Sequence, residues 1–381
     1  MRVLYLIDSL IAGGAERSLA ALAPWYRDAG VRLDVAYLYE RDNVWIPALR
    51  DAGADVVSLA GVGALPAKVR AVSRLVSERR PDVVHTTLFD ADVIGRLATL
   101  TSRVPVACSL VNAAYGPEQL ADPALKRWKV RTAQSIDAIT ARRVTRFHAV
   151  STTVARARAT RLRIAPGRID VIPRGRDPEE LGIRTDARRA KARAALHASD
   201  RDAILLAVGR HEFQKGFDVL LEAFARVHRT HPEARLVVAG RNGAASAGLR
   251  DLAAGLGIAD RVELLGFRDD VPELLCAADV FVAPSRWEGS PGGIIEAMAL
   301  GAPIVASDVP AIREVLAEPE SGTLVPVDDP PALAIAIERV LAGDVPDHST
   351  TAREVFVERY SIDRVAAAMV AFYERVARRS G

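Results

Sequence analysis

The sequence has 381 residues, of which 50% are hydrophobic and 26% charged, and its formal net charge is +3. This length accommodates two domains of ordinary size, and the composition is that of a soluble globular protein. The two cysteines, Cys108 and Cys276, lie far apart in apolar runs. This spacing argues against a disulfide framework or a zinc site, and it predicts a reducing, cytoplasmic environment.

Two further sequence features bear on localisation. No apolar run approaches the roughly 20 residues that are needed to span a bilayer. The apolar run that opens the chain ends at Asp8, which makes it too short for a signal peptide, and it is better explained as a first strand. We therefore expect a cytoplasmic protein.

The first half of the chain alternates strand-like and helix-like segments. The predicted strands are Val3 to Ile7, Leu33 to Leu38, Asp55 to Leu59, Asp82 to His85, Val104 to Leu110, Arg146 to Val150 and Ile169 to Ile172. The predicted helices between them are Glu16 to Ala29, Lys68 to Glu78 and Ala91 to Leu100. This alternation is typical of a parallel sheet wrapped by helices.

A highly charged stretch, Arg174 to Asp202, then breaks the pattern and is the predicted inter-domain linker. The alternation restarts after it. The predicted strands are Ile204 to Val208, Arg235 to Ala239, Val262 to Leu265, Val280 to Ala283, Pro303 to Ala306 and Thr323 to Val325. The predicted helices include Val219 to His228, Leu333 to Leu341 and a long amphipathic one, Arg364 to Arg379. The fold class is therefore α/β, with two Rossmann-like doubly wound domains that face each other across a cleft at the carboxyl ends of both sheets.

The stretch from Ser285 to Gly301 follows a predicted buried strand and leads into a helix. Glu288 falls in the strand-to-helix loop, and Glu296 falls in the first turns of the helix. Gly292 and Gly293 leave the backbone amides between them open to close approach. A helix N-terminus attracts phosphate, whereas carboxylates repel it, so the two glutamates more plausibly accept hydrogen bonds from hydroxyls. A ligand with central phosphates and hydroxyls at both ends is a nucleotide-sugar.

Two other loops follow predicted first strands. Gly209 to Gly216 is not a Walker loop, but Arg210 as a fork and Lys215 as a point charge could both reach a diphosphate. The alternative is ordinary surface charge on a loop. Ile11 to Arg17 is glycine-rich without the Gly-x-Gly-x-x-Gly spacing of a dinucleotide site. It is either a tight turn or a backbone contact to a phosphate or sugar.

Two Asp-x-Asp triplets, Asp90-Ala91-Asp92 and Asp200-Arg201-Asp202, are the candidates for a metal site. Their positions resemble a helix start and the linker, so we expect no metal and no other cofactor. Arg210, Lys215 and a helix N-terminus can neutralise a leaving diphosphate without a metal. The Ser, His and Cys residues form no recognisable nucleophile triad.

Several ordered motifs span almost the whole chain. They are Gly13-Gly14-Ala15-Glu16-Arg17, Asp82-Val83-Val84-His85, Ala149-Val150-Ser151, Val171-Ile172-Pro173-x-Gly175-x-Asp177, Gly209-Arg210 with Lys215-Gly216, and Glu288-x7-Glu296. In this order they resemble the retaining glycosyltransferases of family 4, which have the two-domain GT-B fold. The resemblance implies that residues 1–176 form the acceptor domain and residues 177–360 the domain that binds the nucleotide-sugar donor. It also implies that a C-terminal helix, 361–381, packs back on the first domain.

The resemblance implies roles for individual residues. Arg210 and Lys215 would bind the donor diphosphate and stabilise it as leaving group, and Glu288 would contact the sugar ring; these three form the catalytic set. Glu296 would hold the ribose hydroxyls. The other donor-binding residues would be Ser290, Gly292, Gly293 and Ile294 around sugar and phosphate, Phe267 and Arg268 near the base, and Gly13 and Gly14. Transfer would retain the anomeric configuration, and the diphosphate itself would take the acceptor proton.

Two departures from the family pattern matter. Many members carry a His after the strand Val104 to Leu110, whereas this chain has Asn112 there. Asn112, with Glu16, is assigned to the acceptor and sugar side, but it supplies no protonated imidazole. The usual Asn-Gly of the linker turn is Arg174-Gly175, which adds charge near the predicted cleft.

The basic charge is concentrated between Lys126 and Arg168, where twelve Lys or Arg residues accompany a single acid, Asp137. A solvated helical surface, an anionic membrane surface and a charged acceptor all explain it. Nucleic acid is not expected, because no reading motif accompanies the patch. The expected partners are a UDP- or GDP-sugar, an acceptor (a sugar, a lipid-linked sugar or a small molecule) and, through this stretch, the inner face of an anionic membrane.

Three rival functions remain. A sugar-nucleotide epimerase shares the fold but has no need of the Glu-x7-Glu motif. A nicotinamide-dependent dehydrogenase lacks its glycine fingerprint here. A non-catalytic nucleotide-sugar-binding module would not need to retain Arg210, Lys215 and both glutamates.

Overall fold

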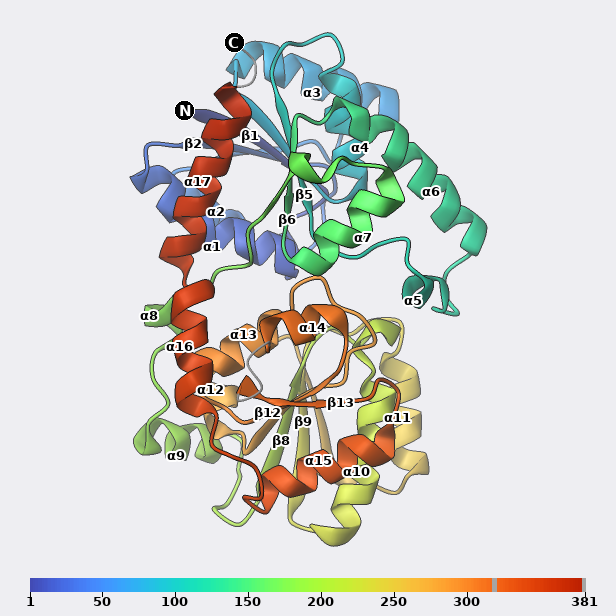
Figure 1. Ribbon diagram of the computed structural model, residues 1–381, viewed down its shortest axis with the longest axis vertical. Coiled ribbons are helices and arrows are strands. Elements are labelled where there is room, and N and C mark those ends of the chain that lie inside the picture. The colour runs from blue at the N-terminus through green and yellow to red at the C-terminus, as the bar shows by residue number, and fades with distance from the viewer. Residues whose placement is uncertain (317–320, 379–381) are drawn as a thin grey trace. The chain divides into compact units, whose positions relative to one another are not determined.

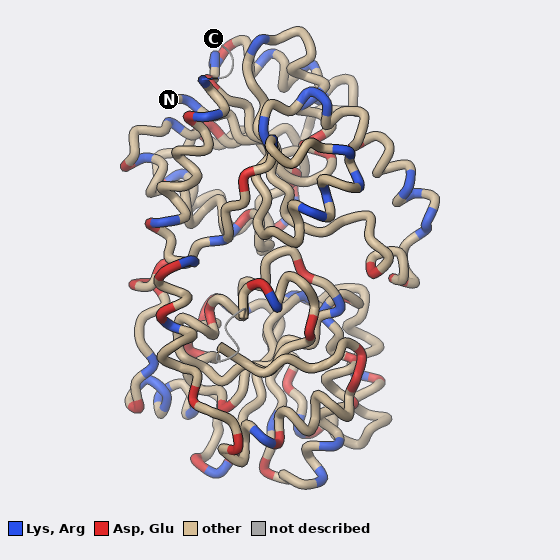
Figure 2. The backbone as a smooth tube through the Cα atoms, in the orientation of Figure 1, with Lys and Arg blue, Asp and Glu red and all other residues tan. Residues whose placement is uncertain are grey.

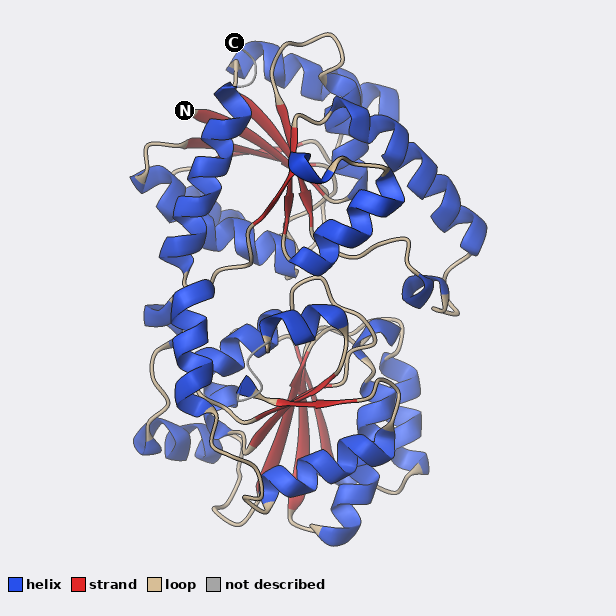
Figure 3. Cartoon of the chain, viewed as in Figure 1, coloured by secondary structure: helices blue, strands red, loops and turns tan. Residues whose placement is uncertain are grey.

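The computed structural model describes residues 1–316 and 321–378, and its chain divides into two compact units. Unit 1 comprises Met1–Gly175 together with the chain from Ser361 onward, and unit 2 comprises Arg176–Tyr360. In each unit helices cover both faces of a parallel sheet (Figure 1, Figure 3). The predicted class, two α/β units with parallel sheets, is confirmed.

The sheet of unit 1 has the order β3-β2-β1-β4-β5-β6-β7, and every neighbouring pair is parallel. Its strands are β1 (Arg2–Ile7), β2 (Arg32–Tyr37), β3 (Asp55–Ser58), β4 (Val83–Thr87), β5 (Val106–Leu110), β6 (Arg146–Ala149) and β7 (Ile169–Val171). Strands such as β4 and β5 are buried along their whole length, as expected where helices cover both faces of a parallel sheet. The strand order reverses between β1 and β4, which places a topological switch point there.

The three helices predicted in the first half of the chain and the long C-terminal one begin close to the predicted positions, whereas the other helices of unit 1 were not predicted. They are α1 (Gly14–Asp28), α2 (Ile46–Asp51), α3 (Leu65–Arg79), α4 (Phe89–Ala98), α5 (Pro117–Leu120), α6 (Arg127–Thr140), η1 (Ala141–Arg143), α7 (Thr152–Leu162), η2 (Pro166–Arg168) and α17 (Ile362–Arg378). Helix α17 buries Ile362, Met369 and Phe372 in the same core as α1 and β1. The last residue of its predicted range, Arg379, lies outside the described residues.

The sheet of unit 2 has the order β10-β9-β8-β11-β12-β13, again parallel throughout. Its strands are β8 (Ala203–Val208), β9 (Ala234–Ala239), β10 (Val262–Gly266), β11 (Val280–Ala283), β12 (Ile304–Ser307) and β13 (Thr323–Val325). Its helices are α8 (Pro178–Leu181), α9 (Asp186–Ala195), η3 (Phe213–Lys215), α10 (Phe217–Thr230), α11 (Ser246–Gly255), η4 (Ala259–Arg261), α12 (Val271–Ala277), α13 (Gly292–Ala299), α14 (Pro310–Val315), α15 (Pro330–Leu341) and α16 (Ser349–Arg359). The switch point lies between β8 and β11.

The predicted linker, Arg174 to Asp202, is wrong for most of its length. Only its first residues cross between the units, and the rest forms α8 and α9 inside unit 2. Helix α9 packs on α12, and its charges are paired: Arg188 with Glu273 at 2.8 Å and Arg189 with Asp279 at 2.5 Å. The stretch is rich in charge because it anchors a helix through ion pairs.

A chain of buried hydrogen bonds runs across the sheet of unit 1. His148 Nε2 lies 2.8 Å from the carbonyl oxygen of Ile172, and a carbonyl only accepts, so Nε2 carries the hydrogen. His148 Nδ1 then accepts from the Ser109 hydroxyl at 2.8 Å. Ser109 accepts in turn from His85 Nε2 at 2.8 Å, and His85 Nδ1 accepts from the Tyr373 hydroxyl at 2.7 Å. Burial lowers the pKa of His148 to about 4 and that of His85 well below its ordinary value, so both rings are neutral.

No helix among residues 1–316 and 321–378 is both long and apolar enough to cross a bilayer.

Candidate active site

The loops that carry the predicted donor residues follow two neighbouring strands of unit 2. Strand β8 pairs with β11 through Leu205 and Val280, and both strands point to the same edge of the sheet. This is the switch point, where the loops after the two strands diverge to leave a crevice. The loop after β8 runs from 209 to 216, and the loop after β11 runs from 284 to 291.

These two loops are joined by hydrogen bonds and a stacked cation. The Arg286 amide donates to the Gln214 carbonyl at 2.8 Å, and Gln214 Nε2 donates to the Trp287 carbonyl at 2.8 Å. The Arg286 guanidinium lies 4.1 Å from the centroid of the Phe213 ring. Gly216 has a φ of 62°, and a Cβ there would collide with the Pro284 carbonyl oxygen. The two loops therefore form one connected platform.

Two of the predicted catalytic residues meet on this platform. Lys215 Nζ lies 2.5 Å from Glu288 Oε1, and the Ser285 hydroxyl donates to the same oxygen at 2.8 Å. Glu288 is only 8% exposed. Arg210, the third member, is exposed in the loop after β8, and within the described residues its side chain has no hydrogen-bond or ion-pair partner. The structure thus brings Lys215 to Glu288 and leaves Arg210 at the surface of the loop.

Glu296, the predicted ribose ligand, is buried in α13 and is held by a residue that sequence reasoning missed. Arg176 Nε lies 2.6 Å from Glu296 Oε1, and both side chains are almost fully buried. The Arg176 amide donates to the Tyr360 carbonyl at 2.8 Å, so the same residue also fixes the end of unit 2. Arg176 stands at the variable position of the Gly175-x-Asp177 motif, and an arginine there was the available signal.

The two glycines that open α13 are explained by packing. A Cβ on Gly292 would lie 2.6 Å from Arg176 Nη2, and a Cβ on Gly293 would lie 3.0 Å from the Phe281 ring. Their side-chain faces are therefore occupied by neighbouring groups. Ser290 and Ile294, the flanking predicted residues, are both buried.

The predicted base-binding residues follow β10, two strands from β8 along the sheet. Phe267 is 52% exposed, which is unusual for a large aromatic side chain and leaves its ring face available. Arg268 is engaged by its own loop, since its Nε donates to Asp270 Oδ1 at 2.7 Å.

In unit 1 the glycine-rich loop leads directly into α1. Gly13 is the residue before the helix, and a Cβ there would lie 2.8 Å from the Glu16 carboxyl carbon. A Cβ on Gly14 would lie 3.1 Å from the Arg174 guanidinium carbon. Both glycines therefore make room for charged side chains of unit 1, and Glu16 itself is only 5% exposed.

Asn112 follows β5 and lines a cavity of about 330 Å³, named here the β5 cavity. Residues at the ends of β4 and β5 form one side of this cavity, and α6 forms the other. Asn112 is exposed, and its Oδ1 accepts from the Ala114 amide at 3.2 Å. Every lining residue belongs to unit 1.

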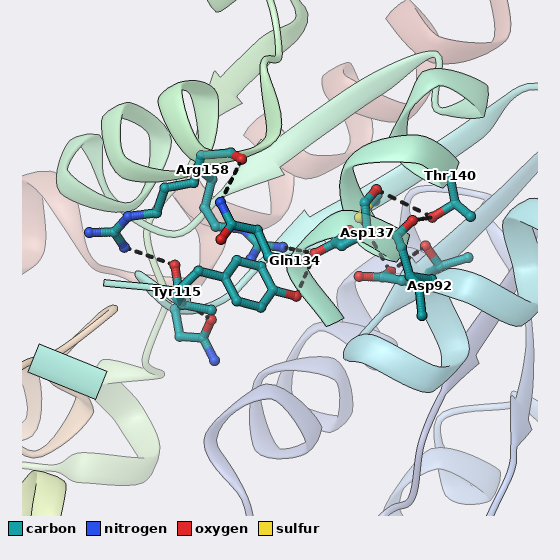
Figure 4. A network of polar contacts seen from close by, with 12 residues as sticks. Asp92, Tyr115, Gln134, Asp137, Thr140 and Arg158 are labelled. Carbon is teal, nitrogen blue, oxygen red and sulfur yellow. Dashed lines mark hydrogen bonds and ion pairs between the residues drawn. The ribbon is translucent and has the colours of Figure 1, made fainter. Parts of the chain in front are cut away.

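Asp137 and Arg158, which line the β5 cavity, belong to the ion-pair network in Figure 4. Asp137 Oδ1 lies 2.6 Å from Arg96, and Asp137 Oδ2 lies 2.7 Å from Arg158 and 2.9 Å from the Tyr115 hydroxyl. Burial acts to raise the pKa of Asp137, but Arg158 and Arg96 overcome it and hold the pKa below its ordinary value. The network joins α4, α6 and α7 through one carboxylate.

The members of each Asp-x-Asp triplet have separate partners. Asp90 accepts from the Tyr39 hydroxyl at 2.6 Å, whereas Asp92 accepts from Thr86 at 2.6 Å. Asp202 accepts from the Ser199 amide at 2.6 Å, while its neighbour Asp200 is exposed. Among the residues that the structure describes, no three His, Cys, Asp or Glu side chains come together as a metal site would require.

The basic stretch is not one continuous surface. Some of its arginines hold the fold: Arg143 donates to backbone carbonyls, Arg146 pairs with Asp170 and Arg158 pairs with Asp137. Counting Arg158 and Arg161 as surface charge was therefore wrong, since Arg161 Nη1 also donates to the Ala114 carbonyl at 2.8 Å. The exposed cations are Lys126, Arg127, Lys129, Arg131, Arg142, Arg156 and Arg163. Blue segments follow the start of α6 in Figure 2, where Trp128 is 64% exposed.

Comparison with known proteins covers both units. Residues 13–175 match the model of a glycosyl transferase 4-like domain, and residues 202–343 match the model of glycosyl transferases group 1. A stretch of 214 residues is 33% identical to an uncharacterized glycosyltransferase of Methanocaldococcus jannaschii and covers 54% of each chain. A stretch of 178 residues is 38% identical to a phosphatidyl-myo-inositol mannosyltransferase of Mycobacterium leprae, over 45% of this chain and 46% of that one. The chain thus spans about half the length of these curated relatives.

Among solved structures, Anabaena HepE in complex with UDP-glucose is similar with a TM-score of 0.86 at 22% identity. The similarity covers 98% of this chain and 100% of HepE. At this identity the likeness establishes the fold, which is GT-B. Together with the two family models, which follow one another along the chain, it shows that the chain belongs to glycosyltransferase family 4.

Proposed function

We propose that this protein is a retaining glycosyltransferase that transfers a sugar from a UDP- or GDP-sugar to an acceptor hydroxyl. The observation that carries the proposal is the platform of unit 2, where Lys215 and Glu288 meet 2.5 Å apart and where Arg176 holds Glu296, the second glutamate of the Glu288-x7-Glu296 motif. A cation beside a carboxylate at a switch point suits a ligand with both phosphates and hydroxyls. Phe267, exposed after β10, supports a stacked base.

The platform suggests how bond cleavage is assisted. Lys215 and Arg210 would neutralise the negative charge that develops on the departing diphosphate, and such electrostatic stabilisation is usually the largest catalytic contribution. Lys215 would have to exchange its contact with Glu288 for the diphosphate, which frees the Glu288 carboxylate for a sugar hydroxyl. The acceptor then attacks on the face from which the diphosphate leaves, and the diphosphate takes the acceptor proton.

The acceptor side is assigned to unit 1, with Asn112 and Glu16 nearest the sugar. One curated relative is named for mannosyl transfer to a phosphatidyl-myo-inositol lipid, which supports a lipid-linked acceptor for this chain. The exposed Lys126, Arg127, Lys129 and Arg131 around Trp128 support contact with an anionic membrane, because each such charge contributes about 1 kcal/mol at the surface.

A thermal-shift screen with UDP-, GDP- and ADP-sugars tests the donor. A ligand at a hundredfold of its Kd stabilises the folded state by about 2.7 kcal/mol, which raises Tm by roughly 5–10 °C for domains of this size. The correct donor should give such a shift, and Lys215→Gln should reduce it. Lys191→Gln, which removes an exposed ammonium from α9, is the matched control and should not. A panel with no shift would overturn the donor assignment.

Transfer itself is followed with the donor that stands out. Proton NMR of the first product formed should show the anomeric configuration of the donor. An inverted product would overturn retention, and an altered free donor without transfer would favour an epimerase.

A further inference from the structure

The β5 cavity has features that the proposed donor chemistry does not use. We propose that it binds a phosphate or carboxylate group of the acceptor, so that the acceptor is an anionic molecule. The assignment of this anion to the acceptor rests on the proposed glycosyl transfer, but the binding of the anion can be tested by itself.

The size of the cavity limits what it holds. At about 330 Å³ it lies at the lower end of the range of roughly 300–1,000 Å³ for small-molecule sites. It therefore suits a single ring or a head group with its charged substituent, and an extended polysaccharide would have to lie mainly outside it.

The carboxylate oxygens in the cavity wall are already engaged. Both oxygens of Asp137 are bound by Arg96, Arg158 and Tyr115. Asp92 receives hydrogen bonds from Thr86 at 2.6 Å and from Cys108 at 3.3 Å, and its second oxygen lies 3.4 Å from Arg96. These carboxylates therefore have little capacity left for the hydroxyls or amines of a ligand.

Two side-chain amides of the cavity lining offer donors. Asn112 Oδ1 accepts from the Ala114 amide at 3.2 Å, and Gln119 Oε1 accepts from the Tyr115 amide at 2.7 Å. These contacts fix the orientation of both amide groups, and within the described residues their NH₂ groups make no hydrogen bond to protein. Arg158, 5% exposed, also has a buried Nε–H without a partner in the described structure.

The net charge of the cavity wall also favours an anion. The carboxylates of Asp92 and Asp137 are cancelled by the guanidiniums of Arg96 and Arg158. Lys129, exposed on α6 and lining the cavity, adds one positive charge. A wall of donors with a net positive charge selects acceptor-rich anions, and ammonium and guanidinium groups pair strongly with phosphate and carboxylate.

The backbone is also unusual at this cavity. Leu88 and Tyr115 both line it, and both are non-glycine residues in the left-handed region, with φ of 77° and 69°. Such conformations persist where the surrounding structure enforces them, and they cluster at ligand sites. Two of them on one cavity support a binding role.

Inorganic phosphate is the first probe, with glycerol as the neutral comparison. The full chain, labelled with ¹⁵N, is titrated in the presence and absence of UDP, and the side-chain amide signals of Asn112 and Gln119 are followed. These signals are assigned from Asn112→Ala and Gln119→Ala. Phosphate should shift both pairs saturably whether UDP is present or not, and glycerol should leave them in place. Unmoved amide signals would overturn the proposal, because both amides line the cavity.

Variants then test the cation. Lys129→Gln should weaken phosphate binding about tenfold or more, the effect of one charge-assisted hydrogen bond. Arg142→Gln removes the same charge from an exposed site outside the cavity, and it should leave phosphate affinity unchanged. Equal losses in both variants would mean a general effect of charge and would overturn the site.

The source of the anion is resolved with glycerol phosphate and with phosphatidylglycerol bicelles. If soluble glycerol phosphate shifts the amides and bicelles do not, the anion belongs to a soluble acceptor; shifts with both indicate a lipid head group. UDP affinity is measured in the same samples. If UDP binds but phosphate leaves the amide signals in place, the anionic acceptor is contradicted and the proposed donor is not. If phosphate shifts the amide signals but UDP does not bind, the proposed donor is contradicted instead.

Discussion

Glu296 lies in unit 2 as one half of a buried ion pair. Because Arg176 Nε is 2.6 Å from its Oε1, a pair of ribose hydroxyls would have to share this carboxylate with the guanidinium. The arginine also pairs with the carboxylate in a buried environment, where a lone charge would be strongly disfavoured. Arg176 is therefore a positioning residue for Glu296, the residue predicted to bind the ribose.

Glu296→Ala should lower donor affinity about tenfold or more, because a hydrogen bond to a charged group contributes roughly 1.5–3 kcal/mol. It should also lower the free energy of unfolding by about 3–5 kcal/mol, because the buried Arg176 loses its ion pair with Glu296. Calorimetric titration with the donor and urea unfolding measure the two effects.

The double variant Glu296→Ala with Arg176→Met separates them. It should recover much of the lost stability, since no buried charge remains, but none of the donor affinity. If either variant bound the donor as tightly as the parent protein, Glu296 would not be the ribose ligand.

Asp8 directly follows β1 at the switch point of unit 1, and burial raises its pKa to about 7. Its Oδ1 accepts from the Ala91 amide at 2.8 Å, and Asp90 and Asp92 add negative charge nearby. A raised carboxyl pKa means that the folded state binds the proton more tightly than the unfolded state. The contribution of Asp8 to stability is therefore full below about pH 4 and is lost as the pH rises towards 7.

Asp8→Asn keeps the acceptor oxygen and removes the titration. As the pH rises from 4 to 7, the parent should lose the contribution of Asp8 to its unfolding free energy and the variant should not. The variant should therefore gain stability relative to the parent, by a few kcal/mol at most. Urea unfolding at several pH values measures this difference, in which the buried histidines cancel. A difference that stays constant across the window would mean that Asp8 has an ordinary pKa.

At the scale of elements, α6 combines exposed cations with exposed apolar side chains. Trp128 is 64% exposed and Ile139 is 65% exposed, while Lys126, Arg127, Lys129 and Arg131 surround the start of the helix. An amphipathic helix with an aromatic residue and basic neighbours is suited to the surface of an anionic bilayer. The buried arginines of the same stretch contribute nothing to this surface.

Vesicle flotation should therefore show the protein rising with anionic but not neutral vesicles, and salt should release it. Replacing Lys126, Arg127, Lys129 and Arg131 by Gln should abolish flotation while donor binding is unchanged. Arg142→Gln with Arg156→Gln removes exposed charge elsewhere and should float as before. If the parent protein stays in the pellet at low salt, membrane contact is excluded and a soluble acceptor takes its place.

The strands could be predicted from the sequence, whereas the pairing of charges could not. Runs such as Val280 to Ala283 are apolar throughout because helices cover both faces of the sheet, so they stand out between polar loops. The charged stretch after Arg174 looked like a linker because pairs such as Arg188 with Glu273 join residues far apart in sequence. Arg176 and Arg158 also pair with residues far away in sequence, so their buried ion pairs could not be predicted either.

At the scale of the whole molecule, the proposed donor site takes the positive charge for a leaving diphosphate from the loop after β8. Transfer should accordingly persist in excess chelator, because Arg210 and Lys215 would perform the role of a divalent cation. The rate of product formation with and without chelator checks this. Complete loss of transfer, restored by magnesium or manganese, would contradict it and return attention to Asp90 and Asp92.

Residues of the candidate site could be proposed from the sequence, whereas their contacts could not. The motif spacing indicated Glu288 and Lys215, but their separation of 2.5 Å depends on β8 lying beside β11, which no local pattern specifies. Of the residues assigned to the site from the sequence, Asn112 lines the β5 cavity, and other parts of its wall come from α6 and from α5, which holds Gln119.

The division of unit 1 along the chain has a consequence for synthesis on the ribosome. Helix α17 packs in the core beside α1, and its Tyr373 hydroxyl donates a hydrogen bond to His85. This helix is nevertheless translated after all of unit 2. Unit 2 can fold as soon as Tyr360 has emerged from the ribosome. Unit 1 is still incomplete at that stage, and the apolar side chains of α1 and β1 that pack on α17 are exposed. Such an exposed apolar surface is a natural target for chaperones during elongation. Folding of unit 1 is thus completed by α17, although the rest of this unit is translated first.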